Sequence, residues 1–138
     1  VARAIDLAKE RGAKRAMELP VSAPFHCPLM QPAADEMQAA LAETKIASPV
    51  VPVIANVRAA PESDPEEIRQ LLVEQITARV RWRESMIWLA DNDAGNLVEL
   101  GNGKVLATMA RRIDPRLTAT ALSTPDDIRA YLEENQGD

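Results

Sequence analysis

Apolar side chains recur every three or four residues in six stretches of the chain, and this spacing predicts amphipathic helices. Two of these helices also have clear start signals. Asp64 precedes Pro65 and Thr124 precedes Pro125, so each would begin with a side-chain cap and a proline in its first turn. The expected helices cover residues 1–11, 29–43, 65–76, 82–90, 104–112 and 125–134.

Short apolar runs between these helices predict strands at residues 16–21, 50–54, 96–100 and 117–122. Pro52 lies within the second run and favours the edge of a sheet, because proline has no N–H to donate to a neighbouring strand. Residues 59–65 are expected to form a loop. Since strands and helices alternate along the chain, we expect an α/β layered fold with parallel strands.

Composition narrows the class of protein further. Apolar residues make up 46% of the 138 residues and charged residues 27%, which is typical of a globular domain with a real core. A net charge of −5 argues against a general nucleic-acid-binding protein, which normally has a dominant basic face. A single cysteine excludes an internal disulfide and favours the cytoplasm, and no apolar run approaches the ~20 residues that cross a bilayer. The chain begins at Val1, already in helical period, which we interpret as the start of a fragment.

The only histidine, His26, lies in a loop (residues 21–30) between an expected strand and an expected helix. Prolines at positions 20, 24 and 28 stiffen this loop, because each fixes its own φ angle. An imidazole has an ordinary pKa of about 6.5, which suits proton transfer near neutrality. The alternative is a structural histidine beside the core. A catalytic dyad of His26 and Cys27 is not favoured, because the side chains of adjacent residues in an extended chain point to opposite sides. A zinc site is not favoured either, because one histidine and one cysteine are too few ligands.

Four segments, taken in order, resemble the malonyl-CoA:acyl-carrier-protein transacylases. They are PVSAPFHC with LMxPAA (residues 20–34), PVIANV (52–57), LVEQI leading to VRW (72–82) and ELGNGKVL (99–106). Two residues depart from the family pattern, since Asn102 and Arg79 stand where that family usually has proline. The family's nucleophile lies in a Gly-His-Ser-x-Gly turn, and the printed sequence contains no such motif.

The resemblance implies a particular architecture. We expect a three-layer α/β/α transacylase-like sheet, similar to that of α/β-hydrolases, of which this chain would be the C-terminal part. Residues 1–20 would be the end of a small ferredoxin-like subdomain, and residues 21–138 would belong to the α/β catalytic domain.

The resemblance also implies roles for individual residues. His26 would be the base that accepts the proton of a serine, and the main-chain carbonyl of Gln75 would orient its ring. Phe25 would favour malonyl over methylmalonyl units, and Asn56, after a strand, would line the substrate site. If the resemblance is set aside, we would interpret Gln75 as an exposed helix residue, Phe25 as a cap on the core and Asn56 as a turn residue.

The Gly-rich turn at residues 101–104 lacks the spacing of a phosphate-binding loop.

The implied activity is transfer of malonyl from coenzyme A to the thiol of acyl carrier protein in fatty-acid biosynthesis, by a Ser-His ping-pong mechanism. No metal and no bound organic cofactor are needed for it. The chain would supply the histidine but not the serine, and alone it would be inactive. An acyltransferase with another acyl-CoA donor and a non-catalytic interaction module remain alternatives. Basic residues could steer the acidic carrier protein toward the site; they are Lys9, Arg11, Lys14 and Arg15, and Lys104, Arg111, Arg112 and Arg116.

Overall fold

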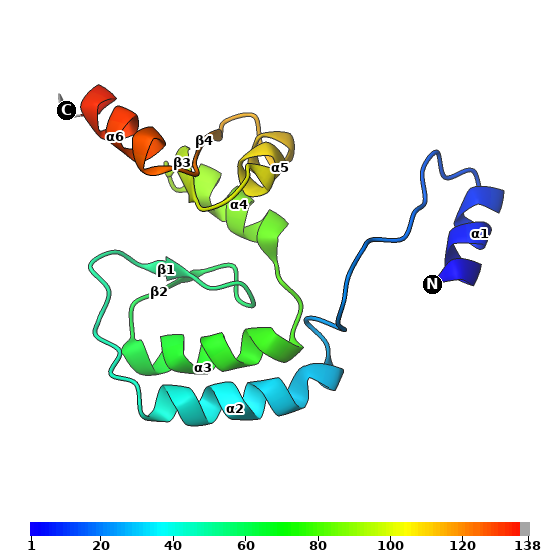
Figure 1. Cartoon of the computed structure of the whole chain (residues 1–138), viewed down its shortest axis with the longest axis horizontal. Coiled ribbons are helices and arrows are strands. Elements are labelled where there is room, and N and C mark those ends of the chain that lie inside the picture. Colours follow the sequence, from blue (N-terminus) through cyan, green and yellow to red (C-terminus); the bar gives the residue numbers. More distant parts are fainter. Residues whose placement is uncertain (136–138) are drawn as a thin grey trace.

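The computed structural model describes residues 1–135 and has a mixed α/β architecture (Figure 1). The six helices predicted from the sequence are confirmed, with ends that move by no more than two residues. A short 3-10 turn, η1 (Pro28–Met30), leads into the second of them. The helices are α1 (Ala2–Glu10), α2 (Gln31–Ala42), α3 (Pro65–Thr77), α4 (Trp82–Asp91), α5 (Val105–Ile113) and α6 (Pro125–Glu134).

The caps expected at two helix starts are both formed. The Asp64 carboxylate accepts hydrogen bonds from the backbone N–H groups of Glu66 and Glu67, at 2.8 and 3.0 Å, and so begins α3. At the start of α6, the Thr124 hydroxyl accepts from the Asp127 N–H, and the Asp127 carboxylate accepts in return from the Thr124 N–H. These local signals explain why the helix boundaries follow from the sequence.

The strands form two separate pairs. β3 (Asn96–Leu100) and β4 (Thr118–Leu122) are parallel, with Asn96 opposite Thr118 and Leu100 opposite Leu122. β1 (Val53–Ile54) pairs with β2 (Pro61–Glu62) in an antiparallel ladder. The expectation of parallel strands is therefore confirmed for β3 and β4 and wrong for β1 and β2.

Three strand and loop predictions need correction. The strand expected at 50–54 is reduced to β1, which begins after Pro52 because proline cannot donate to the ladder. The loop expected at 59–65 contains the short strand β2. No strand forms at 16–21, where Met17 and Leu19 are 57% and 67% exposed, because no neighbouring strand in the described chain takes up their backbone groups.

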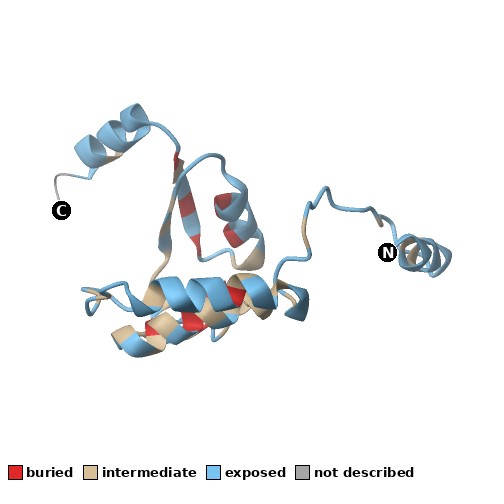
Figure 2. Ribbon diagram, turned by 60° about the horizontal axis from the view of Figure 1, so that its bottom comes forward, coloured by how far each residue is buried: buried red, intermediate tan, exposed pale blue. Residues whose placement is uncertain are grey.

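Two groups of elements bury apolar side chains. In one, α2 packs along α3, and the buried residues of the two helices are Ala34 on α2 and Ile68 and Leu71 on α3. In the other, α4, α5 and β4 enclose a core of Met86, Ala90, Ala110 and Leu117, against which four further apolar residues pack, namely Trp82, Leu89, Leu97 and Ile113. The buried positions are few and lie between these elements (Figure 2).

Much apolar surface stays uncovered. Helix α1 stands apart from the other helices, joined to them by an irregular segment (Figure 1). Leu29 on η1, Leu100 at the end of β3 and Val105 at the start of α5 are 75%, 72% and 67% exposed. Among residues 1–135, no helix is long and apolar enough to cross a membrane.

Candidate active site

The loop that carries His26 is tightly bent. His26 has a φ of 56°, in the left-handed region that few residues other than glycine adopt, although histidine tolerates it better than most. Before it, the Phe25 N–H donates to the Ala23 carbonyl at 2.9 Å, and the Cys27 thiol donates to the Pro24 carbonyl at 3.1 Å. This bend directs the imidazole toward α3. The Cys27 thiol is engaged in a hydrogen bond within the same turn.

The ring of His26 meets the end of α3. Its Nδ1 lies 2.7 Å from the main-chain carbonyl oxygen of Gln75. This carbonyl is available because α3 ends at Thr77 and Ala78 is extended, so the helix does not continue far enough to provide an N–H for it. A carbonyl oxygen only accepts hydrogen bonds, so Nδ1 carries the proton and the neutral ring keeps its lone pair on Nε2. The exposed imidazole can therefore act as a base through Nε2.

Asn56 and Gln75 are joined by their side chains. The Asn56 amide Nδ2 donates to the Gln75 Oε1 at 2.8 Å. Asn56 follows β1 by two residues. The main-chain carbonyl of Asn56 accepts a hydrogen bond from the Arg81 N–H at 2.7 Å. The Arg81 guanidinium also donates to the Arg58 carbonyl at 3.0 Å. The segment after β1 is therefore held by residues on both sides of the α3–α4 junction.

Phe25 lies beside His26 in the chain, and the residue is 57% exposed. It therefore does not pack into the core of this chain, as the structural alternative would require. His26 is also exposed rather than set beside the core, and Gln75 is half-buried with its side chain hydrogen-bonded. The structure thus brings His26, Gln75 and Asn56 together and leaves Phe25 at the open edge of the group.

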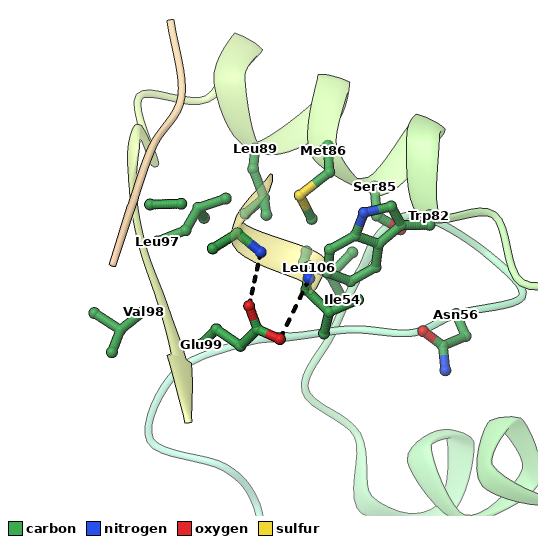
Figure 3. A pocket seen from close by; sticks show the side chains of 12 residues that line it. Ile54, Asn56, Trp82, Ser85, Met86, Leu89, Leu97, Val98, Glu99 and Leu106 are labelled. Atoms are coloured by element: carbon green, nitrogen blue, oxygen red, sulfur yellow. Dashed lines mark hydrogen bonds between the residues drawn. The ribbon is translucent and has the colours of Figure 1, made fainter. Parts of the chain in front are cut away.

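A mostly apolar pocket of about 270 Å³ opens between α4, β3 and α5 (Figure 3). Asn56 lies at its border and Ser85 and Glu99 are its other polar side chains. The indole Nε1 of Trp82 is buried and has no hydrogen-bond partner within the described residues. The remaining lining residues are Ile54, Met86, Leu89, Leu97, Val98, Leu106, Ala107 and Ala119.

Glu99 stabilises the start of a helix, a role that was not predicted from the sequence. Its carboxylate accepts from the backbone N–H groups of Leu106 and Ala107, at 3.3 and 2.8 Å, and so caps the start of α5 from the neighbouring strand (Figure 3). These N–H groups have no partner within the helix, and the positive end of the helix dipole attracts the carboxylate. The signal in the sequence was a glutamate one residue before the end of a strand that leads into a Gly-rich turn.

Several charged side chains are engaged within the chain. Arg116 pairs with Asp91 and Asp114, each at 2.7 Å, and its hydrogen bonds lower the pKa of Asp114 to about 2. Backbone N–H groups of residues 63 and 64 hold the pKa of Glu62 below its ordinary value. The Arg111 guanidinium donates to the Ala119 carbonyl. Arg116 is thus paired with two carboxylates, whereas Arg111 is held by a backbone carbonyl and keeps its charge, so steering of the carrier protein by these basic residues stays a prediction. Among the described residues, no group of three or more acidic, histidine or cysteine side chains could hold a metal ion.

Comparison with known proteins gives a consistent set of relatives. The malonyl CoA-acyl carrier protein transacylase of Salmonella typhimurium is 43% identical over 134 residues, which are 97% of this chain and 43% of that protein. That of Bacillus subtilis is 39% identical over 130 residues, covering 94% of this chain and 41% of the relative. No model of a protein family matches the chain.

Solved structures agree with these relatives. The acyl-carrier-protein S-malonyltransferase from Bartonella henselae has a TM-score of 0.86 at 50% identity, over 96% of this chain and 42% of that one. A malonyl-transacylase solved in complex with its type II polyketide synthase acyl-carrier protein has a TM-score of 0.85 at 40% identity, over 97% and 43%. The chain thus spans about two fifths of the length of the relatives it matches. In both sequence and fold, it corresponds to a portion of the malonyl-CoA:acyl-carrier-protein transacylases.

Proposed function

We propose that this chain is the histidine-bearing part of a malonyl-CoA:acyl-carrier-protein S-malonyltransferase of fatty-acid biosynthesis. The observation that carries the proposal is the hydrogen bond between His26 Nδ1 and the Gln75 carbonyl. It orients the ring and leaves Nε2 as the proton-accepting atom, which is what a serine acyltransferase needs from its base. The relatives named for this activity support the same reading.

In the first half-reaction, His26 Nε2 takes the proton of the nucleophilic serine, whose Gly-His-Ser-x-Gly turn is not in the printed sequence. The serine oxygen attacks the thioester carbonyl of malonyl-CoA, the C–S bond breaks, and the imidazolium returns its proton to the coenzyme A thiolate. The product is a malonyl ester on the serine. Throughout, the Gln75 carbonyl keeps Nδ1 protonated and stabilises the imidazolium that forms transiently.

In the second half-reaction, the phosphopantetheine thiol of acyl carrier protein gives its proton to His26 Nε2 and attacks the serine ester. The C–O bond breaks, and the serine oxygen recovers a proton from the imidazolium. Only protons and one acyl group move, so the chemistry requires neither a metal nor an organic cofactor. Phe25 would limit the space beside the acyl group, and Asn56 would lie at the border of the same site.

We also propose a division of the chain into subdomains and a cellular compartment for the enzyme. Residues 1–20 would be the end of a ferredoxin-like subdomain, and residues 21–138 the C-terminal part of a three-layer α/β/α catalytic domain. The separate position of α1 supports this division (Figure 1). A single cysteine supports a cytoplasmic site of action.

Exposed apolar side chains favour this proposal over a stand-alone interaction module. Residues of the core elements β3 and α5, including Leu100 and Val105, are largely uncovered. A module that folds alone would expose fewer large apolar groups on its central strands. These side chains are positioned to be covered by further parts of the same enzyme.

The test is His26→Ala in the enzyme that contains this chain, followed by measurement of malonyl transfer to acyl carrier protein by mass spectrometry. We expect kcat to fall by about 10²- to 10⁴-fold, the usual contribution of a general base. Asn92→Ala is the matched control, because it removes an exposed side-chain hydrogen bond at the end of α4, away from His26. Activity within twofold of the unaltered enzyme would contradict the proposal. Transfer of another acyl group in preference to malonyl would leave the base in place but change the substrate.

A further inference from the structure

The role of the Gln75 side chain is not explained by the hydrogen bond to His26. That bond uses the main-chain carbonyl, which every residue possesses. The side chain of residue 75 would then be free to vary. In the structure, however, it is half-buried and its Oε1 accepts from the Asn56 Nδ2 at 2.8 Å. The side chain therefore has a partner of its own, on a different element.

The two hydrogen bonds meet in a single residue. Gln75 accepts from Asn56 through its side chain and from His26 through its backbone, so the three residues form a continuous chain from the end of β1 to the imidazole. Gln75 lies in the last turn of α3, two residues before the helix ends. Terminal turns of helices fray readily because their carbonyls lack helical partners. A carbonyl in such a turn needs an additional constraint in order to point in one direction.

We infer that Asn56 is a positioning residue that latches Gln75, and that it thereby holds the carbonyl oxygen on which the orientation of the His26 ring depends. This inference rests on the proposed function and deepens it. It gives Asn56 a role besides its place at the border of the substrate site, since one of the two amide N–H groups donates to Gln75.

Asn56 is itself held in place by hydrogen bonds to the segment that carries it. The Arg81 N–H donates to the Asn56 carbonyl at 2.7 Å, and the Arg81 guanidinium donates to the Arg58 carbonyl at 3.0 Å. Ala59, buried and with a φ of 53°, closes the turn that follows. Below the amide pair, Ile54, Leu71 and Leu72 line an apolar pocket of about 120 Å³ that Asn56 and Gln75 also border. Asn56 itself is exposed, so this apolar pocket limits competition from water on one side of the amide pair only.

The test uses the chain as it stands, labelled with ¹⁵N, because its single histidine gives one unambiguous pair of imidazole nitrogen signals. The ratio of the Nδ1–H to the Nε2–H form is measured at a pH where the ring is neutral. Asn56→Ala removes the donor, and Gln75→Met removes the acceptor while keeping the backbone carbonyl. Each should lower the ratio about three- to tenfold, in the range of one net hydrogen bond. The double variant should lower it no further, because both changes break the same bond.

A rescue variant separates positioning from a general loss of structure. Asn56→Gln combined with Gln75→Asn moves one methylene across the pair and should restore most of the ratio. Asn92→Ala, which removes a 2.8 Å hydrogen bond from an asparagine at the end of α4, should leave the ratio unchanged. Far-ultraviolet circular dichroism identifies variants that fail to fold, and Gln75→Met carries the test if Asn56→Ala is among them.

Three results would overturn the latch: an unchanged ratio in folded Asn56→Ala or Gln75→Met, additive effects in the double variant, or an equal effect of Asn92→Ala. Failure of the proposed function has a different signature. It would appear as an Nε2–H ring in the unaltered chain, or as full transfer activity of His26→Ala in the enzyme.

Discussion

His26 Nδ1 and the main-chain carbonyl oxygen of Gln75 lie 2.7 Å apart, although the two residues are 49 positions apart in the chain. The contact combines a left-handed bend at His26 with the early end of α3. Neither feature produces it alone. The bend directs the ring toward the helix, and the helix end leaves a carbonyl without an internal partner. A main-chain oxygen then does what a carboxylate does in other triads, because it accepts from Nδ1 and leaves Nε2 for the substrate.

Replacement of Phe25 tests the acyl selectivity of the proposed enzyme. Phe25→Ala removes a ring next to the base and should admit an α-methyl group. We expect the ratio of kcat/KM for malonyl-CoA over methylmalonyl-CoA to fall about tenfold, which is typical for one methyl group in an apolar pocket. Leu29→Ala is the control, because it truncates another exposed apolar side chain close by. An unchanged ratio for Phe25→Ala would show that the ring does not shape the acyl site.

Replacement of Glu99 tests the cap on α5. Glu99→Ala leaves the N–H groups of Leu106 and Ala107 without an acceptor, and we expect a loss of about 1 kcal/mol in the free energy of unfolding. Glu99→Gln retains one acceptor oxygen and should lose less. Glu133→Ala, on the exposed side of α6, is the control. Urea denaturation measures all three, and equal midpoints for Glu99→Ala and Glu133→Ala would refute the cap.

The Asp114–Arg116 pair predicts a stability that depends on pH. The native pKa of Asp114 is about 2, below its ordinary 3.8, because Arg116 donates to the carboxylate. A lowered pKa stabilises the folded chain above about pH 4, and this contribution disappears as the pH falls from about 4 to 2. Asp114→Asn should lower the denaturation midpoint at pH 7 and flatten its dependence on pH between 4 and 2. Asp6→Asn on α1 is the control. A parallel pH dependence in Asp114→Asn and the unaltered chain would disprove the assignment.

Uncovered apolar residues predict the behaviour of the isolated chain. Leu100 and Val105 flank the Gly-rich turn and are largely exposed, so the chain should bind an apolar dye and associate as its concentration rises. Leu100→Lys with Val105→Lys should reduce both effects, whereas Glu133→Lys changes charge without removing apolar surface. Dye fluorescence and sedimentation give the readouts. A monodisperse chain without dye binding would instead favour the stand-alone interaction module.

Local structure could be predicted from the sequence because its causes are local. The Asp64 and Thr124 caps and the apolar spacing of each helix lie within a few residues of one another. Strands depend on neighbours elsewhere in the chain. Residues 16–21 have strand-like composition but no partner in the described chain, and Pro61–Glu62 pairs with β1 despite a loop-like composition.

The candidate site divides in the same way. His26 stands out as the only histidine, but its contact with Gln75 was expected only through the family resemblance, since no periodicity links positions 49 apart. The hydrogen bond from Asn56 to Gln75 was not predicted, because it requires the end of β1 and the last turn of α3 to meet. Glu99 was placed in a motif without a role. Its function depends on how the turn folds back onto the strand.

The tautomer of the single imidazole in the unaltered chain, read from its ¹⁵N chemical shifts at a pH where the ring is neutral, tests directly whether the Gln75 carbonyl orients His26. We expect the Nδ1–H form to predominate, because the Gln75 carbonyl can only accept a hydrogen bond, which requires the proton to be on Nδ1. A ring that is mainly in the Nε2–H form would contradict it.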